Sequence, residues 1–287
     1  MKDSQAILGL MVATVIFAPF ILKLTLVFWI MNLAVVYSIL VLSWIIMNKY
    51  TGYTSFAHSI PFGISAYLFA LYGFLSIPVS CFISFVIFLI LSKLNKEKFV
   101  FSTFILAIVF WMAVPYLTFN YDNIVVGGEE GLSLKSLPLM DSYLLSSSFL
   151  ITSLFLLLFL EKTRVGLYLL AVGNDEVAAM GLGLNVNLIK SVCFVISSLI
   201  AVFSGVFYAV FFGHVSPDVF SVEVSLFPFI ATILGQSYPV SVLISFALIL
   251  STRASVLVKY HLLLYASLLV VFPKLRRYAI ARGAKFI

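Results

Sequence analysis

The feature that most limits the possible folds of this chain is a series of long apolar segments with very few charges between them. Of its 287 residues, 63% are hydrophobic and 10% are charged, and the mean hydropathy is +1.19. Soluble domains carry about 25% charged residues, so this chain cannot cover a soluble surface. The sequence therefore predicts an all-α, polytopic transmembrane helical bundle.

A transmembrane helix needs roughly 20 apolar residues. Candidate spans are predicted at 5–22, 24–47, 59–75, 77–92, 99–119, 143–160, 188–212, 222–236, 239–252 and 255–272. The first could be a signal peptide, but no small-x-small cleavage site follows it, which favours a span. The pair within Ser225–Thr252 is short for two crossings, so a break at Gly235–Pro239 could make it a re-entrant hairpin. We expect about 8–10 spans in a single transmembrane domain, 1–287.

Lysine and arginine are unequally distributed between alternate loops, which predicts the orientation. With the amino terminus inside, ten crossings place both termini in the cytoplasm. The inside residues are then Lys2, Lys49, Lys93, Lys96, Lys98, Lys162, Arg164, Lys190, Lys274, Arg276, Arg277, Arg282 and Lys285. The outside residues are Lys23, Lys135, Arg253 and Lys259. The net charge of +6 fits the anionic cytoplasmic leaflet and needs no nucleic acid. We expect a multi-pass protein of the cell membrane, in contact with lipid.

Cys81 and Cys193 both lie in apolar runs. They are interpreted as small buried residues rather than a disulfide or a metal pair. No stretch is long and polar enough for a separate soluble domain, so we expect no ATPase or other enzyme within this chain.

One polar island, residues 161–187, interrupts the apolar second half and falls on the cytoplasmic side. Its centre is predicted to be a short helix with an asparagine N-cap, two acidic residues at the positive end and glycines that end it in a left-handed turn. Two alanines would leave a smooth face for a partner. The residues of this candidate docking helix are Asn174, Asp175, Glu176, Ala178, Ala179, Gly181 and Gly183. On composition alone, an ordinary interfacial loop is the favoured alternative.

A second polar stretch, Thr51–Gly63, leads from the cytoplasmic end of one apolar run into the next. Its glycines and Pro61 discourage regular helix, and irregular backbone at membrane depth is tolerated only against protein or a water-filled cavity. The candidate residues for a translocation path are Gly52, Thr54, Ser55, His58 and Gly63. A packed interhelical turn whose hydroxyls bond to the backbone is an equally good interpretation.

Two external stretches complete the set of candidates. The acidic loop 120–142 contains a glycine cluster that allows positive φ, and the loop 213–221 contains turn residues. The candidate residues for an external lid or docking surface are Gly127, Gly128, Gly131, Ser216, Pro217 and Asp218. A flexible loop tip is the alternative for the first stretch. His214, Asp218 and Glu223 could form an acid–base set, but a structural role is favoured.

Taken together, these stretches resemble the LIV-type permease of branched-chain amino acid ABC importers, specifically its LivM-like subunit, over about residues 37–273. The matching pieces are Gly52–His58 with Gly63–Tyr67, Gly127–Gly131, Thr163–Gly166, Asp175–Val186 with Lys190, Ala201–Tyr208, Val215–Ser221 and Leu269–Pro273. In that family the cytoplasmic loop docks on an ATPase, so the resemblance favours a coupling role for Asp175–Gly183. A change of Ala179 to glutamate is then expected to uncouple transport while leaving the protein in the membrane.

The resemblance also implies a set of partners: a second permease subunit, two ATP-binding cassette subunits and an extracellular solute-binding protein. ATP and Mg²⁺ would bind in the partners, with no cofactor in this chain. The expected function is translocation of branched-chain or other small apolar amino acids, or a related small polar solute. The alternatives are an ion- or proton-driven carrier, which would need a membrane-buried carboxylate, and an intramembrane enzyme using His58 with Ser55 or Ser59.

Overall fold

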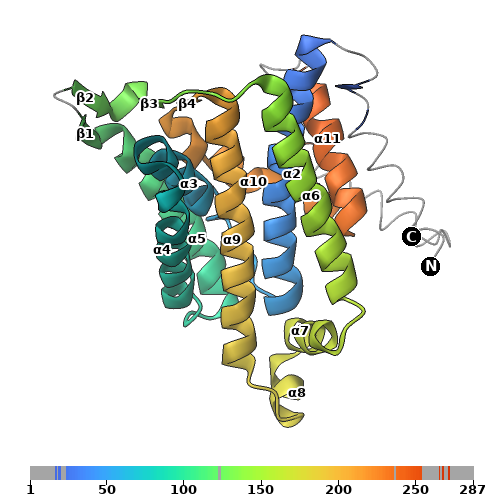
Figure 1. Cartoon of the computed structure of the whole chain (residues 1–287). Coiled ribbons are helices and arrows are strands. Elements are labelled where there is room, and N and C mark those ends of the chain that lie inside the picture. Colours follow the sequence, from blue (N-terminus) through green and yellow to red (C-terminus); the bar gives the residue numbers. More distant parts are fainter. Residues whose placement is uncertain are drawn as a thin grey trace.

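The chain is described by a computed structural model whose described residues are almost entirely helical, apart from two short two-stranded sheets (Figure 1). This confirms the predicted all-α bundle. The described residues are 17, 19–20, 24–121, 124–235, 237–253, 265, 267 and 271. The predicted spans 5–22 and 255–272, and both chain termini, lie almost wholly outside them.

Within the described residues, five helical stretches are long and apolar enough to cross a membrane. They are Thr25–Thr51, Ser59–Leu91, Lys96–Tyr116, Leu139–Leu160 and Val186–Phe212. The α-helices are α2 (Thr25–Thr51), α3 (Ser59–Tyr72), α4 (Ser76–Leu91), α5 (Lys96–Ala113), α6 (Leu139–Leu160), α7 (Arg164–Asn174), α8 (Glu176–Gly181), α9 (Val186–Phe212), α10 (Val222–Gly235) and α11 (Tyr238–Arg253). The 3-10 turns are η1 (Gly73–Leu75), η2 (Val114–Tyr116), η3 (Gly128–Glu130) and η4 (Pro217–Phe220).

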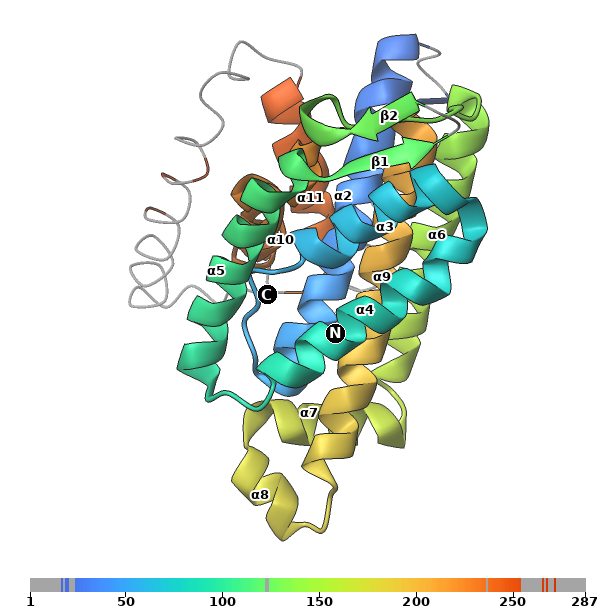
Figure 2. The same cartoon turned by 90° about the vertical axis from the view of Figure 1, so that its left-hand side faces the viewer.

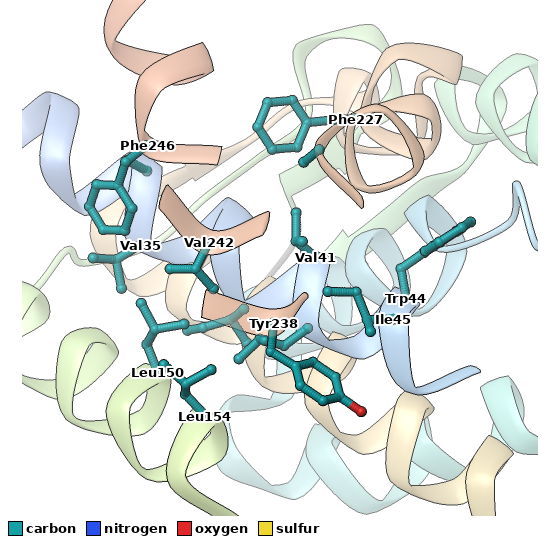
Figure 3. Packing of buried hydrophobic residues seen from close by; sticks show 14 of the residues in the cluster. Val35, Val41, Trp44, Ile45, Leu150, Leu154, Phe227, Tyr238, Val242 and Phe246 are labelled. Carbon is teal, nitrogen blue, oxygen red and sulfur yellow. The ribbon is translucent and has the colours of Figure 1, made fainter. Parts of the chain in front are cut away.

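Helix α2 is the centre of the bundle, in contact with α6, α7, α9, α10 and α11. Between Ile30 and Met47 every residue of α2 except Tyr37 is buried, so this part of the helix is apolar on all sides. Figure 3 shows the core that results, with side chains from α2, α6, α10 and α11 meeting between the helices. The labelled members are Val35, Val41, Trp44, Ile45, Leu150, Leu154, Phe227, Tyr238, Val242 and Phe246.

Small and hydroxylated residues let the helices approach closely, as expected where lipid removes the hydrophobic force between spans. A Cβ added to Gly205 of α9 would collide with the carbonyl oxygen of Phe62 in α3, so this crossing requires glycine. The Ser204 hydroxyl donates to the Val36 carbonyl at 2.7 Å, and the hydroxyls of Ser38 and Ser245 lie 2.8 Å apart. These bonds tie α2 to α9 and α11.

The predicted spans 59–75 and 77–92 correspond to α3 and α4, which pack against each other on either side of η1. With 14 residues, α3 is shorter than an ordinary span, and it continues through η1 into α4, so that Ser59–Leu91 forms one stretch long enough to cross a membrane. Residues 52–58 run back along α2 from its end to the start of α3 (Figure 2).

The predicted interruption of the segment 225–252 is present. Helix α10 ends at Gly235 and α11 begins at Tyr238, and the two pack together. Pro239 lies in the first turn of α11, where its missing N–H costs no helical hydrogen bond. With 14 and 16 residues, both helices are shorter than an ordinary span.

The predicted external loop 120–142 and the two residues before it contain short strands that we did not predict. β1 (Thr118–Tyr121) pairs antiparallel with β2 (Ile124–Gly127). β3 (Leu132–Ser133) pairs with β4 (His214–Val215), so that Leu132 faces Val215. The second pairing joins the two external stretches of the sequence analysis, which lie about 80 residues apart in the chain.

Candidate docking helix and translocation path

The described bundle has two different ends. Helices α7 and α8 lie at one end, with α7 running across the ends of the spans and α8 projecting beyond it (Figures 1 and 2). The short strands β1–β4 lie at the other end (Figure 1). The polar island and the external loops of the sequence analysis therefore fall on opposite ends, as the predicted orientation requires.

Helix α7 is amphipathic, which the sequence analysis did not predict because it treated only residues 174–181 as helical. The Thr163 hydroxyl accepts from the Gly166 N–H at 3.2 Å and caps the helix. Leu169 and Val172 are buried beneath it. A Cβ on Gly173 would collide with the Lys49 carbonyl, so α7 ends in direct backbone contact with the end of α2.

Helix α8 begins one residue later than predicted. Asn174 is the last residue of α7 and does not cap α8, which corrects the predicted N-cap. Asp175 has extended backbone angles and its carboxylate accepts from the N–H groups of Val177 at 2.9 Å and Ala178 at 3.1 Å. A carboxylate both caps the helix and suits its positive end. At the other end Gly183 is left-handed, with φ of 79°, as predicted, whereas Gly181 is still helical.

The two alanines of α8 do not share an exposed face. Ala178 is exposed, but Ala179 is 1% exposed and packs with Val172 and Val186. The predicted Ala179→Glu test is therefore unsuitable, because a glutamate there would disrupt packing inside this chain. The exposed apolar side chains of this segment are Val177 (75%), Met180 (55%) and Leu182 (76%).

Glu176 is held inside the chain by two lysines. Its role therefore differs from that of Asp175, the other acidic residue at the start of the helix. The Glu176 carboxylate lies 2.6 Å from Lys190 Nζ of α9 and 3.3 Å from Lys96 Nζ of α5. Lys190 is buried at 8% exposure, and its ammonium lies 4.6 Å from the ring centroid of Tyr53. We call Glu176, Lys190, Lys96 and Tyr53 the α8 clamp.

The start of α7 is held in a similar way. Lys49, near the end of α2, forms an ion pair with Glu161, which follows α6. The Lys49 ammonium also lies 4.7 Å from the Tyr238 ring centroid, and the Tyr238 hydroxyl donates to the Tyr50 hydroxyl at 2.8 Å. The α7–α8 unit is therefore tied at its start to α2 and α11 and at its end to α5 and α9.

The predicted path residues lie together along the 52–58 segment and the start of α3. Gly52 is left-handed, with φ of 68°, and a Cβ there would lie 2.8 Å from Lys96 Nζ. The Thr54 hydroxyl accepts from the Asn48 amide at 3.0 Å, and that of Ser55 accepts from the Ala57 N–H at 3.1 Å. A Cβ on Gly63 would lie 2.5 Å from the Phe220 ring. In this conformation the segment is closely packed, and its role in transport stays a prediction.

His58 is fully buried at the start of α3, where α9 and α10 meet it. Ser197 donates its hydroxyl proton to the Ser43 carbonyl at 2.9 Å, so its oxygen accepts from His58 Nε2 at 3.2 Å. Next to it, the Ser225 hydroxyl donates to that of Ser59 at 2.6 Å. No acidic side chain is recorded within bonding distance of His58 in the described part of the chain, so an intramembrane hydrolase arrangement has no base-orienting group there.

At the opposite end, the predicted external residues form one unit. Gly127, Gly128 and Gly131 all have positive φ. A Cβ on Gly131 would collide with the carbonyl oxygen of Val215, so glycine permits the two external loops to touch. His214 Nδ1 lies 3.2 Å from the Ser133 hydroxyl across the β3–β4 pair. Ser216, Pro217 and Asp218 lead into η4, beside this contact.

The sequence analysis did not assign Tyr53 and Lys96 to any site. Lys96 could be recognised only as a first-turn residue of α5, and Tyr53 only as an aromatic residue within the matched motif. Glu176, the partner of Lys96, lies 80 residues further along the chain, and Lys190, which contacts Tyr53, lies 137 residues away from it.

The chain was also compared with families of known proteins. The family model described as the permease component of branched-chain amino acid transport systems matches residues 26–273. This range contains the docking helix, the 52–63 stretch and both external loops. No curated protein and no solved structure gave a match. Because the family model covers most of the chain, the protein belongs to the family of permease components of branched-chain amino acid transport systems.

Proposed function

We propose that this chain is one of two membrane-spanning subunits of an ABC importer that is driven by two ATP-binding cassette subunits. One of these ATP-binding subunits docks on α8 of this chain. ATP and Mg²⁺ bind in those partners, and an extracellular solute-binding protein delivers the solute to the opposite end. The solute is a branched-chain or other small apolar amino acid. The support is the family match together with the form of the α7–α8 end.

The observation that carries this proposal is the apolar surface of α8. Val177, Met180 and Leu182 are all more than half exposed, yet α8 projects beyond the ends of the spans (Figure 1). Apolar side chains gathered on a projecting capped helix are typical of a segment that inserts into a partner's groove. The groove proposed here belongs to the ATP-binding subunit.

The α8 clamp provides a route by which the motion of the ATP-binding subunits reaches the membrane-spanning helices. Asp175 holds the start of α8, and Glu176 connects it through Lys190 to α9 and through Lys96 to α5. Tyr53 connects the same lysines to the 52–58 segment. When the ATPases close, displacement of α8 pulls on three elements of the bundle, and the path alternates in access. The chain itself forms and breaks no covalent bond.

A single added charge on α8 tests this proposal. Val177→Asp should prevent co-purification of the ATP-binding subunits and abolish ATP-driven leucine uptake in reconstituted vesicles, because it places a charge in an apolar contact. Asn187→Asp adds the same charge at an exposed position near α8 and should leave both unchanged. Normal assembly and uptake in Val177→Asp, or leucine uptake by vesicles holding this chain alone without ATP, would overturn the proposal.

A further inference from the structure

A pocket of about 440 Å³ lies between the end of α4 and the start of α9, at the α7–α8 end of the bundle (Figure 1). Its walls come from these two helices and from the turn that follows α4. The volume is within the range of about 300–1,000 Å³ that is usual for small-molecule sites. Ile90 and Lys93 on its wall are exposed, so the pocket opens to the outside of the bundle.

The charged groups of this pocket are both positive. Lys93 and Lys190 line it, and among the described residues no aspartate or glutamate does so. Lys190 also belongs to the α8 clamp, where the single carboxylate of Glu176 faces two ammonium groups, those of Lys190 and Lys96. This sharing leaves positive charge over. Lys93 forms no ion pair within the described part of the chain, so its ammonium group is available to an anion.

The serine hydroxyls beside these lysines already donate their protons to the backbone. The Ser92 hydroxyl donates to the Leu89 carbonyl at 2.8 Å, and the Ser191 hydroxyl donates to the Asn187 carbonyl at 2.9 Å. Such bonds to a preceding carbonyl are common for serine in helices. Recognition of a ligand therefore depends mainly on the lysine ammonium groups, which form their strongest hydrogen bonds with phosphate or carboxylate oxygens.

The rest of the wall is apolar and continues into the outer surface of the bundle. Val86, Leu89 and Ile90 of α4 line the pocket, and Ile90 is 62% exposed. Further along the same two helices, Phe82 of α4 and Val195 of α9 are also exposed. Both helices belong to stretches that are long and apolar enough to cross a membrane, so we expect these side chains to contact acyl chains. The pocket thus joins positive charge at the end of the spans to an apolar surface along them.

We propose that this pocket binds the phosphate head group of an anionic phospholipid. The phosphate lies against Lys93 and Lys190, and the acyl chains follow the exposed apolar side chains of α4 and α9. Basic pockets between membrane-spanning helices bind anionic head groups in this way. Acyl chains are as apolar as the side chains they replace, so the head group decides which lipid is preferred. This inference is independent of the solute and of the ATP-binding subunits in the proposed function.

Native mass spectrometry of the purified full chain tests the inference with three probes. They are phosphatidylglycerol, phosphatidylcholine with the same acyl chains, and glycerol 3-phosphate, which has an anionic head and no chains. The native chain should bind phosphatidylglycerol at least about fivefold more tightly than phosphatidylcholine, which is the effect of one lysine near an anionic surface. Glycerol 3-phosphate should bind much more weakly than phosphatidylglycerol, because it lacks the contacts along α4 and α9.

Three variants locate the site. Lys93→Gln should remove most of the preference for phosphatidylglycerol, whereas Lys93→Arg keeps the charge and should retain the preference. Lys162→Gln is the matched control, since Lys162 is exposed at the same end of the bundle but does not line the pocket, and it should leave the preference unchanged. Both positions are exposed, and circular dichroism verifies that each variant is folded.

Equal binding of the two lipids by the native chain would overturn the inference. So would a preference that is undiminished in folded Lys93→Gln, or one that Lys162→Gln lowers equally, since the latter would indicate general attraction to a positive surface. Binding of glycerol 3-phosphate as tight as that of phosphatidylglycerol would make this a site for a soluble anion and would also overturn it. The experiment contains no ATPase and no solute, so its failure is distinct from a failure of the Val177→Asp test.

Discussion

At the residue scale, Lys190 departs furthest from the usual behaviour of its residue type. Lysine is almost never fully buried unless it is paired, and this one is 8% exposed, with Glu176 at 2.6 Å and the Tyr53 ring beneath it. The lysine aliphatic stem packs in the bundle while the ammonium reaches the α7–α8 end. Its pairing with Glu176 decides where α8 sits.

A double-mutant cycle tests that statement. Lys190→Met and Glu176→Gln should each lower the free energy of unfolding by about 1–2 kcal/mol. Glu176→Gln leaves the buried Lys190 ammonium without a carboxylate, and Lys190→Met leaves the Glu176 carboxylate with the more distant Lys96 alone. The double variant should cost less than the sum, with a coupling of about 0.5–3 kcal/mol. The measurement is denaturant titration of the full chain in mixed micelles, followed by circular dichroism.

Lys162→Met serves as the control for this cycle, since Lys162 is exposed at the same end and should change stability by less than about 0.5 kcal/mol. Strict additivity of the two single changes would show that the ion pair does not hold α8 to α9.

At the element scale, close approach of helix backbones shapes the bundle. The 52–58 segment can run back along α2 only because α3 fits tightly against α9, and this fit depends on Gly205 facing the Phe62 carbonyl and the Ser65 hydroxyl. Gly173 likewise permits close backbone contact between α7 and the end of α2. These contacts leave no room for even one methyl group.

Replacing the glycine of the α3–α9 crossing should therefore be costly. Gly205→Ala should lower the free energy of unfolding by about 1–3 kcal/mol through overpacking. Gly181→Ala, also at a helical glycine, meets nothing within 4 Å and should be neutral or stabilising by up to about 1 kcal/mol. Thermal unfolding of the two variants in the same detergent provides the measurement, and equal midpoints would contradict a backbone-to-backbone contact at Gly205.

At the scale of the whole molecule, the two ends carry different chemistry. The α7–α8 end holds the ion pairs of Lys49, Lys96 and Lys190, whereas the opposite end carries the strands β1–β4 and the exposed carboxylates of Glu129, Glu130 and Asp218. Basic residues favour the cytoplasmic side of a membrane, so we expect α8 inside the cell and η3 outside.

Site-directed labelling checks this orientation. In a Cys81→Ser, Cys193→Ala background, a membrane-impermeant maleimide applied to intact cells should label Glu129→Cys and leave Gly181→Cys unlabelled. Permeabilised cells should show labelling of both, because both positions are exposed. Labelling of Gly181→Cys in intact cells would place the docking helix on the wrong side for any ATP-driven scheme.

Several features of this protein were determined by its sequence alone. The apolar runs, the break at Gly235–Pro239, the left-handed glycines at 127, 128, 131 and 183, and the presence of a short helix in the polar island all depend on local properties: hydropathy, backbone freedom and capping. The motifs that carry the family resemblance also lie within short stretches. These predictions needed no knowledge of distant contacts. Within the described residues the structure confirms the helices, the break and the left-handed glycines, and the family match confirms the resemblance.

Other features were decided only by the tertiary structure. Asp175 rather than Asn174 caps α8, because α7 continues through Asn174 while packed on the end of α2. Ala179 faces inward because Val172 and Val186 lie beneath it. The 52–58 segment extends along α2 because α3 packs closely against α9 at Gly205. The α8 clamp and the contact at Gly131 each unite residues far apart in the chain. Their geometry depends on how whole helices cross, and no local pattern of residues specifies that.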